Sequence, residues 1–94
     1  MTKTEIKKEL LNLITEFFNE TDNEKASKIK DTIFEKVLAC PYGENGLGVV
    51  KDSLSMWSEN ISSYLTQKDK SSTQQAYLAL MGVATIPDIS FLED

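Results

Sequence analysis

Residues 40–48 hold the chain's only cysteine and three of its four glycines, so chemistry is sought there first. A glycine-rich loop can cradle a phosphate group, but a P-loop needs a Lys-Ser or Lys-Thr pair directly after its last glycine. Here Gly48 is followed by Val49 and Val50, and the segment before the loop has the pattern of a helix rather than a strand. The segment is therefore expected to connect two helices.

Cys40 is the one thiol that could act as a nucleophile. A reactive thiolate is stabilised by a helix N-terminus, a histidine or a cationic neighbour. Cys40 falls instead at the expected end of a helix, where the helix dipole disfavours negative charge. The chain also contains no histidine to serve as its base. We expect Cys40 to be a small, partly buried structural residue.

The other residue types exclude most catalytic and metal centres. One cysteine without histidine cannot build the common zinc sites, and no acidic stretch has the ligand spacing and central glycine of a calcium loop. A serine triad lacks its histidine. The carboxylates that could work as an acid–base pair lie on polar faces of expected helices: Glu9, Glu16, Glu20 and Glu35. The sequence predicts a protein that is not an enzyme and has no catalytic, metal-binding or cofactor-binding residues.

The charge balance narrows the expected partners. Ten lysines face fifteen acidic residues, the net charge is −5, and arginine is absent. Nucleic-acid-binding proteins normally carry a basic surface, and arginine is the commonest reader of guanine, so nucleic acid is not expected. The N-terminal residues lack the apolar core of a signal peptide, and no apolar run approaches the roughly 20 residues that span a membrane. We expect a cytoplasmic protein with no membrane partner.

Apolar residues recur at three- and four-residue intervals, which predicts four helices at about residues 3–20, 22–40, 48–66 and 72–85. The fourth is apolar on most sides, as is typical of a helix buried against several neighbours. No segment alternates for long enough to be a strand. The expected fold is all-α, with one domain over residues 1–94. It is a small, mainly antiparallel four-helix bundle with a glycine-rich loop between helices two and three.

Local signals mark where these helices begin and end. Capping-box spacings stand at three of the starts, in the pairs Thr2 and Glu5, Thr21 and Glu24, and Ser71 and Gln74. A proline disfavours helical geometry in the residue before it and cannot donate a backbone hydrogen bond. Pro41 is therefore expected to end the second helix. Pro87 is expected to end the fourth and to leave an extended tail over residues 87–94.

Two surfaces are predicted to meet another protein. In the loop, a tyrosine projects from a turn beside acidic and amide groups: Tyr42, Glu44 and Asn45. Aromatic side chains anchor many interfaces, and acidic groups steer a basic partner. The tail combines apolar and acidic residues outside any periodic element: Asp88, Phe91, Leu92 and Glu93. The alternatives are that the loop tyrosine is simply solvent-exposed and that Ile89 and Phe91 fold back over the core.

The order of features over residues 41–57 resembles that of the colicin-type nuclease immunity proteins. The features are Pro41-Tyr42-Gly43 after the second helix, then Gly48-Val49-Val50-Lys51, then Trp57. That family consists of small, acidic, four-helix proteins that bind and neutralise a basic nuclease. The chain lacks the family's tandem-tyrosine short third helix and has a much longer helix in its place. What the resemblance implies is a small acidic protein that occludes a basic surface of its partner.

The sequence thus favours a non-enzymatic protein-binding module. We expect a small acidic inhibitor, immunity-type or adaptor protein that covers a basic surface on another protein. The alternative is a homo-oligomer that binds or sequesters a small ligand between its helices, with the apolar fourth helix as a wall. A third interpretation is one subunit of a larger assembly whose partner covers that helix and the tail.

Overall fold

Five helices and no strand make up the part of the chain that the computed structural model describes, residues 2–40 and 46–90. Four of these helices are long: α1 (Lys3–Asn19), α2 (Asn23–Leu38), α3 (Gly46–Gln67) and α4 (Lys70–Ala84). The fifth, α5 (Ile86–Ser90), follows α4 after a single residue. The predicted all-α four-helix fold is confirmed, and each long helix begins and ends within two residues of its predicted bounds.

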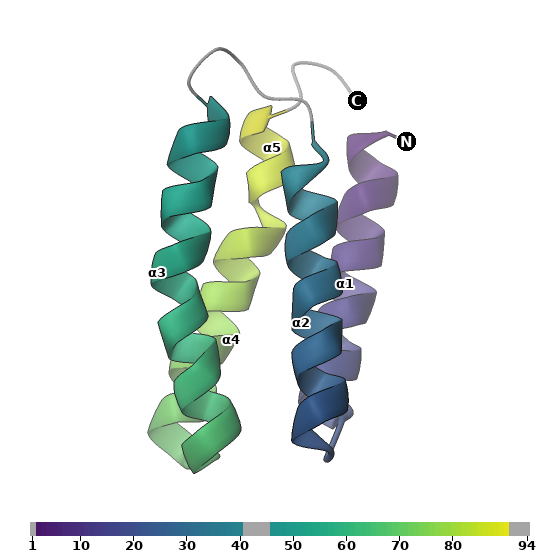
Figure 1. Cartoon of the computed structure of the whole chain (residues 1–94). Helices are drawn as coiled ribbons and strands as arrows, with labels where there is room; N and C mark the ends of the chain where they lie inside the picture. Colours follow the sequence, from purple (N-terminus) through teal and green to yellow (C-terminus); the bar gives the residue numbers. More distant parts are fainter. Residues whose placement is uncertain (1, 41–45, 91–94) are drawn as a thin grey trace.

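The long helices run antiparallel to their neighbours in the chain (Figure 1). The α1–α2 and α3–α4 turns lie at one end of the bundle, and the start of α1 and the end of α5 lie at the other. α1 packs chiefly on α2, and α3 chiefly on α4, so the fold consists of two helical hairpins laid against each other. Contact between α1 and α4 is much less extensive.

Side-chain caps fix where α1 and α2 begin. The Thr2 hydroxyl accepts a hydrogen bond from the N–H of Glu5 at 3.2 Å, as the capping spacing predicts. The cap predicted for α2 is wrong by one residue. Asp22, rather than Thr21, accepts from the N–H groups two and three positions later, at 2.9 and 3.2 Å. Aspartate is a stronger N-cap than threonine, and its charge suits the positive end of the helix dipole.

The core contains the apolar stripes that the periodicity predicts. All four long helices contribute large side chains that are fully buried: Leu10, Phe17, Ile33, Val37, Ile61, Leu80 and Val83. Burying one such side chain stabilises the fold by roughly 1.5–3 kcal/mol. Tyr64 is buried as its place on the stripe predicts, whereas Trp57 is only partly buried and packs against the core from α3.

Polar contacts join neighbouring helices at their edges, one within the α1–α2 hairpin and one between the two hairpins. Lys36 on α2 forms an ion pair with Glu9 on α1, with 2.8 Å between Nζ and Oε2. The side-chain amide of Asn23 donates to the carbonyl of Leu65 at 2.9 Å and so joins the start of α2 to the last turn of α3. Contacts of this kind near solvent contribute roughly 1 kcal/mol or less each. They set the alignment of the helices, while apolar burial supplies most of the stability.

Cys40 lies directly after the C-cap residue of α2. The residue is buried, and its Sγ donates to the carbonyl of Lys36 at 3.6 Å. The sulfur therefore lies beside the negative end of the α2 dipole, which disfavours the thiolate. The expected burial of Cys40 is confirmed.

The extended tail predicted from Pro87 onward is wrong for residues 87–90, which belong to α5. Proline is tolerated in the first turn of a helix, because the N–H that it lacks would have no partner within the helix. Pro87 is the second residue of α5 and is fully buried. Residues 91–94 lie outside the described part of the chain, so the alternative in which Phe91 folds back over the core is not tested.

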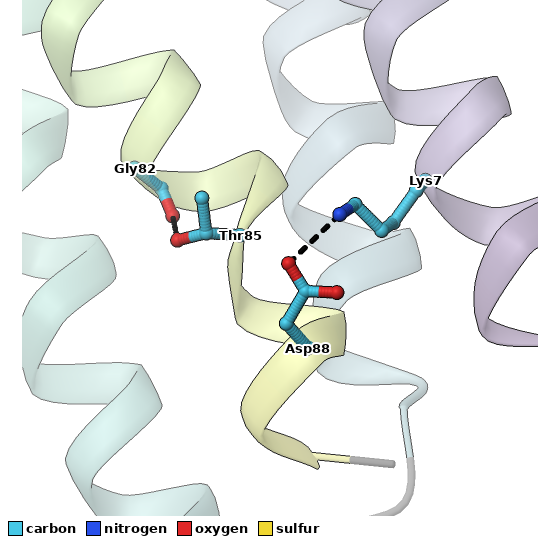
Figure 2. Close-up of polar contacts among 4 residues, drawn as sticks. All are labelled: Lys7, Gly82, Thr85 and Asp88. Carbon is cyan, nitrogen blue, oxygen red and sulfur yellow. Dashed lines mark hydrogen bonds and ion pairs between the residues drawn. The ribbon is translucent and has the colours of Figure 1, made fainter. Parts of the chain in front are cut away.

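Two contacts hold α5 in place (Figure 2). The Thr85 hydroxyl, between α4 and α5, donates to the carbonyl of Gly82 at 2.7 Å. On α5 itself, Asp88 pairs with Lys7 of α1, with 2.7 Å between Oδ2 and Nζ. The first of these contacts is local, but the second joins opposite ends of the sequence. The start of the tail is therefore part of the bundle.

Candidate functional site

An open groove lies between α1 and α4, at the end of the bundle that holds the two short turns. Its volume is about 1020 Å³. The second half of α1, the end of α3 and the first two turns of α4 line it, with Ile14, Phe18, Tyr64, Lys68, Lys70 and Tyr77 among the lining residues. We refer to it as the α1–α4 groove. Contact between α1 and α4 is limited, which leaves room for the groove.

Aromatic rings form the apolar surface of the groove. Phe18 packs edge-on against Tyr64, with ring centroids 5.2 Å apart, and lies 6.0 Å from the Tyr77 ring. Behind them the buried Phe17 contacts both Phe18 and Tyr64, with centroids 5.1 and 5.5 Å away. Such aromatic pairs add roughly 0.5–1.5 kcal/mol beyond the area that they bury. The groove surface is thus held rigidly from the core, yet half of the Tyr77 surface is exposed to solvent.

Cationic side chains stand at the edge of the groove. Lys68 follows α3 directly and has φ 51°, a left-handed conformation in which glycine is the usual helix-ending residue. Its N–H donates to the Tyr64 carbonyl at 2.9 Å, and its Nζ lies 6.0 Å from the centroid of the Tyr64 ring. Lys70 is the first residue of α4 and is exposed. The two lysines flank Asp69, the acidic residue that lines the groove.

Asp69 is committed to capping α4. Its carboxylate accepts from the N–H of Ser72 at 2.7 Å, and the Ser72 hydroxyl in turn accepts from the N–H of Asp69 at 3.2 Å. This reciprocal capping box begins two residues earlier than the predicted one at Ser71, which is therefore wrong. Hydrogen bonding from Ser72, through its side chain and then its backbone, lowers the pKa of Asp69. At neutral pH the carboxylate is therefore ionised and hydrogen-bonded to the first turn of α4.

We expect the stabilising effect of the Asp69 charge to depend on pH. Because its pKa is lower in the folded than in the unfolded chain, the ionised form stabilises the fold above the unfolded value, about 3.9, and this stabilisation is lost as pH falls through the folded value. The Asp69→Asn variant should have a lower Tm than the parent at neutral pH, and the difference should shrink as the pH falls below about 3.9. Thermal unfolding by circular dichroism, at neutral and at acid pH, measures both. A difference that does not change between the two conditions would contradict the assignment.

Among the residues predicted to contact a partner, the structure describes Asp88. Asp88 is exposed and takes part in the ion pair with Lys7, so it helps to hold α5 on α1. The other predicted partner-binding residues lie outside the described part of the chain: Tyr42, Glu44, Asn45, Phe91, Leu92 and Glu93. Their roles stay predictions. The described part of the tail lies at the end of the bundle opposite the α1–α4 groove.

The sequence predicted the residues of the groove only as parts of helices and did not mark them as a site. The fourth helix was expected to be buried on most sides, which is wrong for Tyr77 and Leu78, exposed by 50% and 63%. Their apolar character beyond the core stripe is the signal that could have marked a surface. Tyr77 lies on the helix that was expected to form the wall of a ligand site. Nothing in the local sequence pairs Phe18 of α1 with it.

Two further features are absent from the described residues. Within residues 2–40 and 46–90, no three or more cysteine, aspartate and glutamate side chains are grouped where a metal ion could be held. None of the helices in these ranges has both the length and the apolar composition needed to cross a lipid bilayer.

The chain is an all-α bundle with an open, aromatic-lined groove between α1 and α4. Comparisons with models of protein families, with curated proteins and with solved structures gave no match. The features that bear on function are those of the groove and of the residues around it.

Proposed function

We propose that this protein is a non-enzymatic binding module that holds a helical segment of another protein in the α1–α4 groove. The observation that carries the proposal is the aromatic lining of a concave site between two helices, where Tyr64 is buried, Phe18 is partly buried and half of the Tyr77 surface is exposed. A helix with one apolar face commonly docks into a hydrophobic groove of this kind, with anchors three and four residues apart. Aromatic side chains are also enriched among the residues that dominate binding energy.

The shape of the groove favours a peptide segment over a small molecule. Small ligands bury roughly 70–90% of their surface in pockets of about 300–1,000 Å³. This groove is at the upper limit of that range, about 1020 Å³, and is widely open to solvent. A small apolar ligand would remain largely wet here. An amphipathic helix needs to bury only its apolar stripe and leaves its polar face in water, which suits an open groove.

The alternative is sequestration of a small apolar ligand between the helices. The volume and the aromatic lining of the same groove support it. Mass spectrometry of the purified protein under non-denaturing conditions separates the two. A stoichiometric adduct that disappears on denaturation would favour the small ligand and count against the helix proposal. Unmodified mass is expected.

The proposed module belongs to the class expected from the sequence, which includes inhibitors, immunity-type proteins and adaptors acting in the cytoplasm. The predicted second surface, at Asp88 and the residues of the loop and tail, would contact a basic region of the same or another partner. Asp88 of that surface lies on α5, at the opposite end of the bundle from the groove. A contact at Asp88 therefore does not compete with one in the groove.

A displayed library of amphipathic helices tests the groove directly. Each member has about 14 residues, or four turns, with a fixed helical pattern and randomised side chains. We expect selection on the parent protein to enrich peptides whose affinity falls roughly tenfold or more on Tyr77→Ala, because Tyr77 supplies exposed aromatic surface. Affinities are measured by fluorescence anisotropy of labelled peptides.

Met56→Ala is the matched control. Met56 is a large apolar residue on α3, is 66% exposed and is outside the groove lining. Selected peptides should bind this variant and the parent equally well. If no peptide is enriched over an unrelated helical bundle, or if the enriched peptides bind Tyr77→Ala as tightly as the parent, the proposal is overturned.

A further inference from the structure

The groove edge has the opposite charge to the molecule as a whole. The chain carries a net charge of −5 with fifteen acidic residues, but Asp69 is the acidic one that lines the described groove. Two lysines line it as well, Lys68 and Lys70. α4, one of the two walls, has no acidic residue along its whole length from Lys70 to Ala84. The groove therefore carries a local positive charge on an acidic protein.

The two lysines are available to a ligand. Within residues 2–40 and 46–90, neither Lys68 nor Lys70 forms an ion pair. The ammonium group of Lys68 makes one long hydrogen bond, 3.5 Å, to the carbonyl of Thr21. The carboxylate between them, on Asp69, is held by the N–H of Ser72 and does not neutralise them in a direct contact. Both cations can thus turn toward a negative group in the groove.

A third cation extends this edge along α1. Lys8 precedes Thr15, a groove residue, by seven positions and so lies on the same side of α1, two turns away. Lys8 is exposed. A helix lying in the groove would have Lys68 and Lys70 near one end and Lys8 near the other. Its apolar stripe would face the rings of Phe18 and Tyr77.

We infer that the segment held in the groove is an acidic amphipathic helix, with aspartate or glutamate on both sides of its apolar stripe. This inference rests on the proposed function and adds the charge of the partner to it. Complementary charges raise the rate of association and fix the register of the partner. A basic helix would be drawn to the acidic faces of the bundle but repelled at the groove edge.

The charge of the peptides selected from the helix library tests the inference. We expect the enriched pool to contain more aspartate and glutamate beside the apolar stripe than the starting library. A selected acidic peptide should bind the double variant Lys68→Glu/Lys70→Glu roughly tenfold or more weakly than the parent. The same peptide with its acidic residues changed to lysine should reverse that order. Affinity for the parent should fall as salt rises from about 50 to 300 mM, because added salt shortens the Debye length and so screens the attraction between the peptide and the lysines.

Lys51→Glu is the control for net charge, since Lys51 is an exposed residue of α3 that does not line the groove. It should change the affinity by less than about twofold. An enriched pool that is neutral or basic, or binding that ignores both the double variant and salt, overturns the inference and leaves the proposed function intact. Failure to select any groove-dependent peptide overturns both. Circular dichroism establishes that each variant is folded.

Discussion

The Phe17→Ala variant is expected to lose about 3–5 kcal/mol of unfolding free energy, the range for deleting a fully buried aromatic side chain. Phe17 has no solvent-exposed surface, and its ring contacts Phe18 and Tyr64. Alanine would leave a cavity between α1 and α3 that the neighbouring rings can fill only in part. A 94-residue domain has roughly 5–14 kcal/mol in total, so this loss is a large fraction of its stability.

Urea denaturation followed by circular dichroism measures this loss. Leu78→Ala is the control, because Leu78 is a large apolar residue with 63% of its surface exposed, and its truncation should change stability by no more than about 0.5 kcal/mol. The Phe17 variant should also bind the selected peptides more weakly, since the rings of the groove lose the support behind them. A cost below about 1 kcal/mol would mean that Phe17 is not packed as described.

Helical periodicity predicted the four long helices and their core stripes because burial of one face decides both. On α3, for example, Ile61 and Tyr64 lie on the apolar stripe and are buried. The exact starts were harder to predict, since several residues that can cap a helix follow one another in each turn. At α2 the choice between Thr21 and Asp22 depends on which side chain reaches the free N–H groups once the chain has turned. Spacing alone does not contain that information.

The tail was mispredicted because its conformation depends on tertiary contacts. Pro87 is a legitimate signal for the end of α4, but it is equally compatible with the first turn of a new helix. What favours α5 is the burial of Ile86 and Pro87 and the ion pair between Asp88 and Lys7. Lys7 belongs to the first helix, so no local pattern around residue 87 could have revealed this partner.

The α1–α4 groove could not be predicted for a related reason. Phe18 and Tyr77 each look like an ordinary apolar position at the side of a helix stripe. They meet only in the folded bundle, where the second half of α1 lies beside the first turns of α4. The local positive charge is equally hidden, since it depends on which lysines the α3–α4 turn brings to the groove.

The contact between Gly82 and Trp57 yields the second large expected effect. A Cβ at position 82 would lie 3.2 Å from Cζ2 and 3.3 Å from Cη2 of the Trp57 ring, closer than ordinary packing allows. Gly82→Val should therefore lower the unfolding free energy by about 2–3 kcal/mol, because overpacking outweighs the gain in helix propensity. The chain's single tryptophan reports directly on the displaced ring through its fluorescence.

Gly48 and Gly82, each inside a long helix, make a matched pair for this test. A Cβ on Gly48, in α3, would meet nothing within 4 Å, so Gly48→Ala should stabilise the protein by roughly 0.5–1 kcal/mol through helix propensity alone. Gly82→Ala has the same intrinsic gain but must move Trp57, and we expect no net stabilisation. If the two alanine variants gained equal stability, the Trp57 ring would be free to shift. Trp57→Phe should then recover none of the stability that Gly82→Val loses. If the contact is tight, the effects of Trp57→Phe and Gly82→Val on the unfolding free energy should be coupled by about 1 kcal/mol or more.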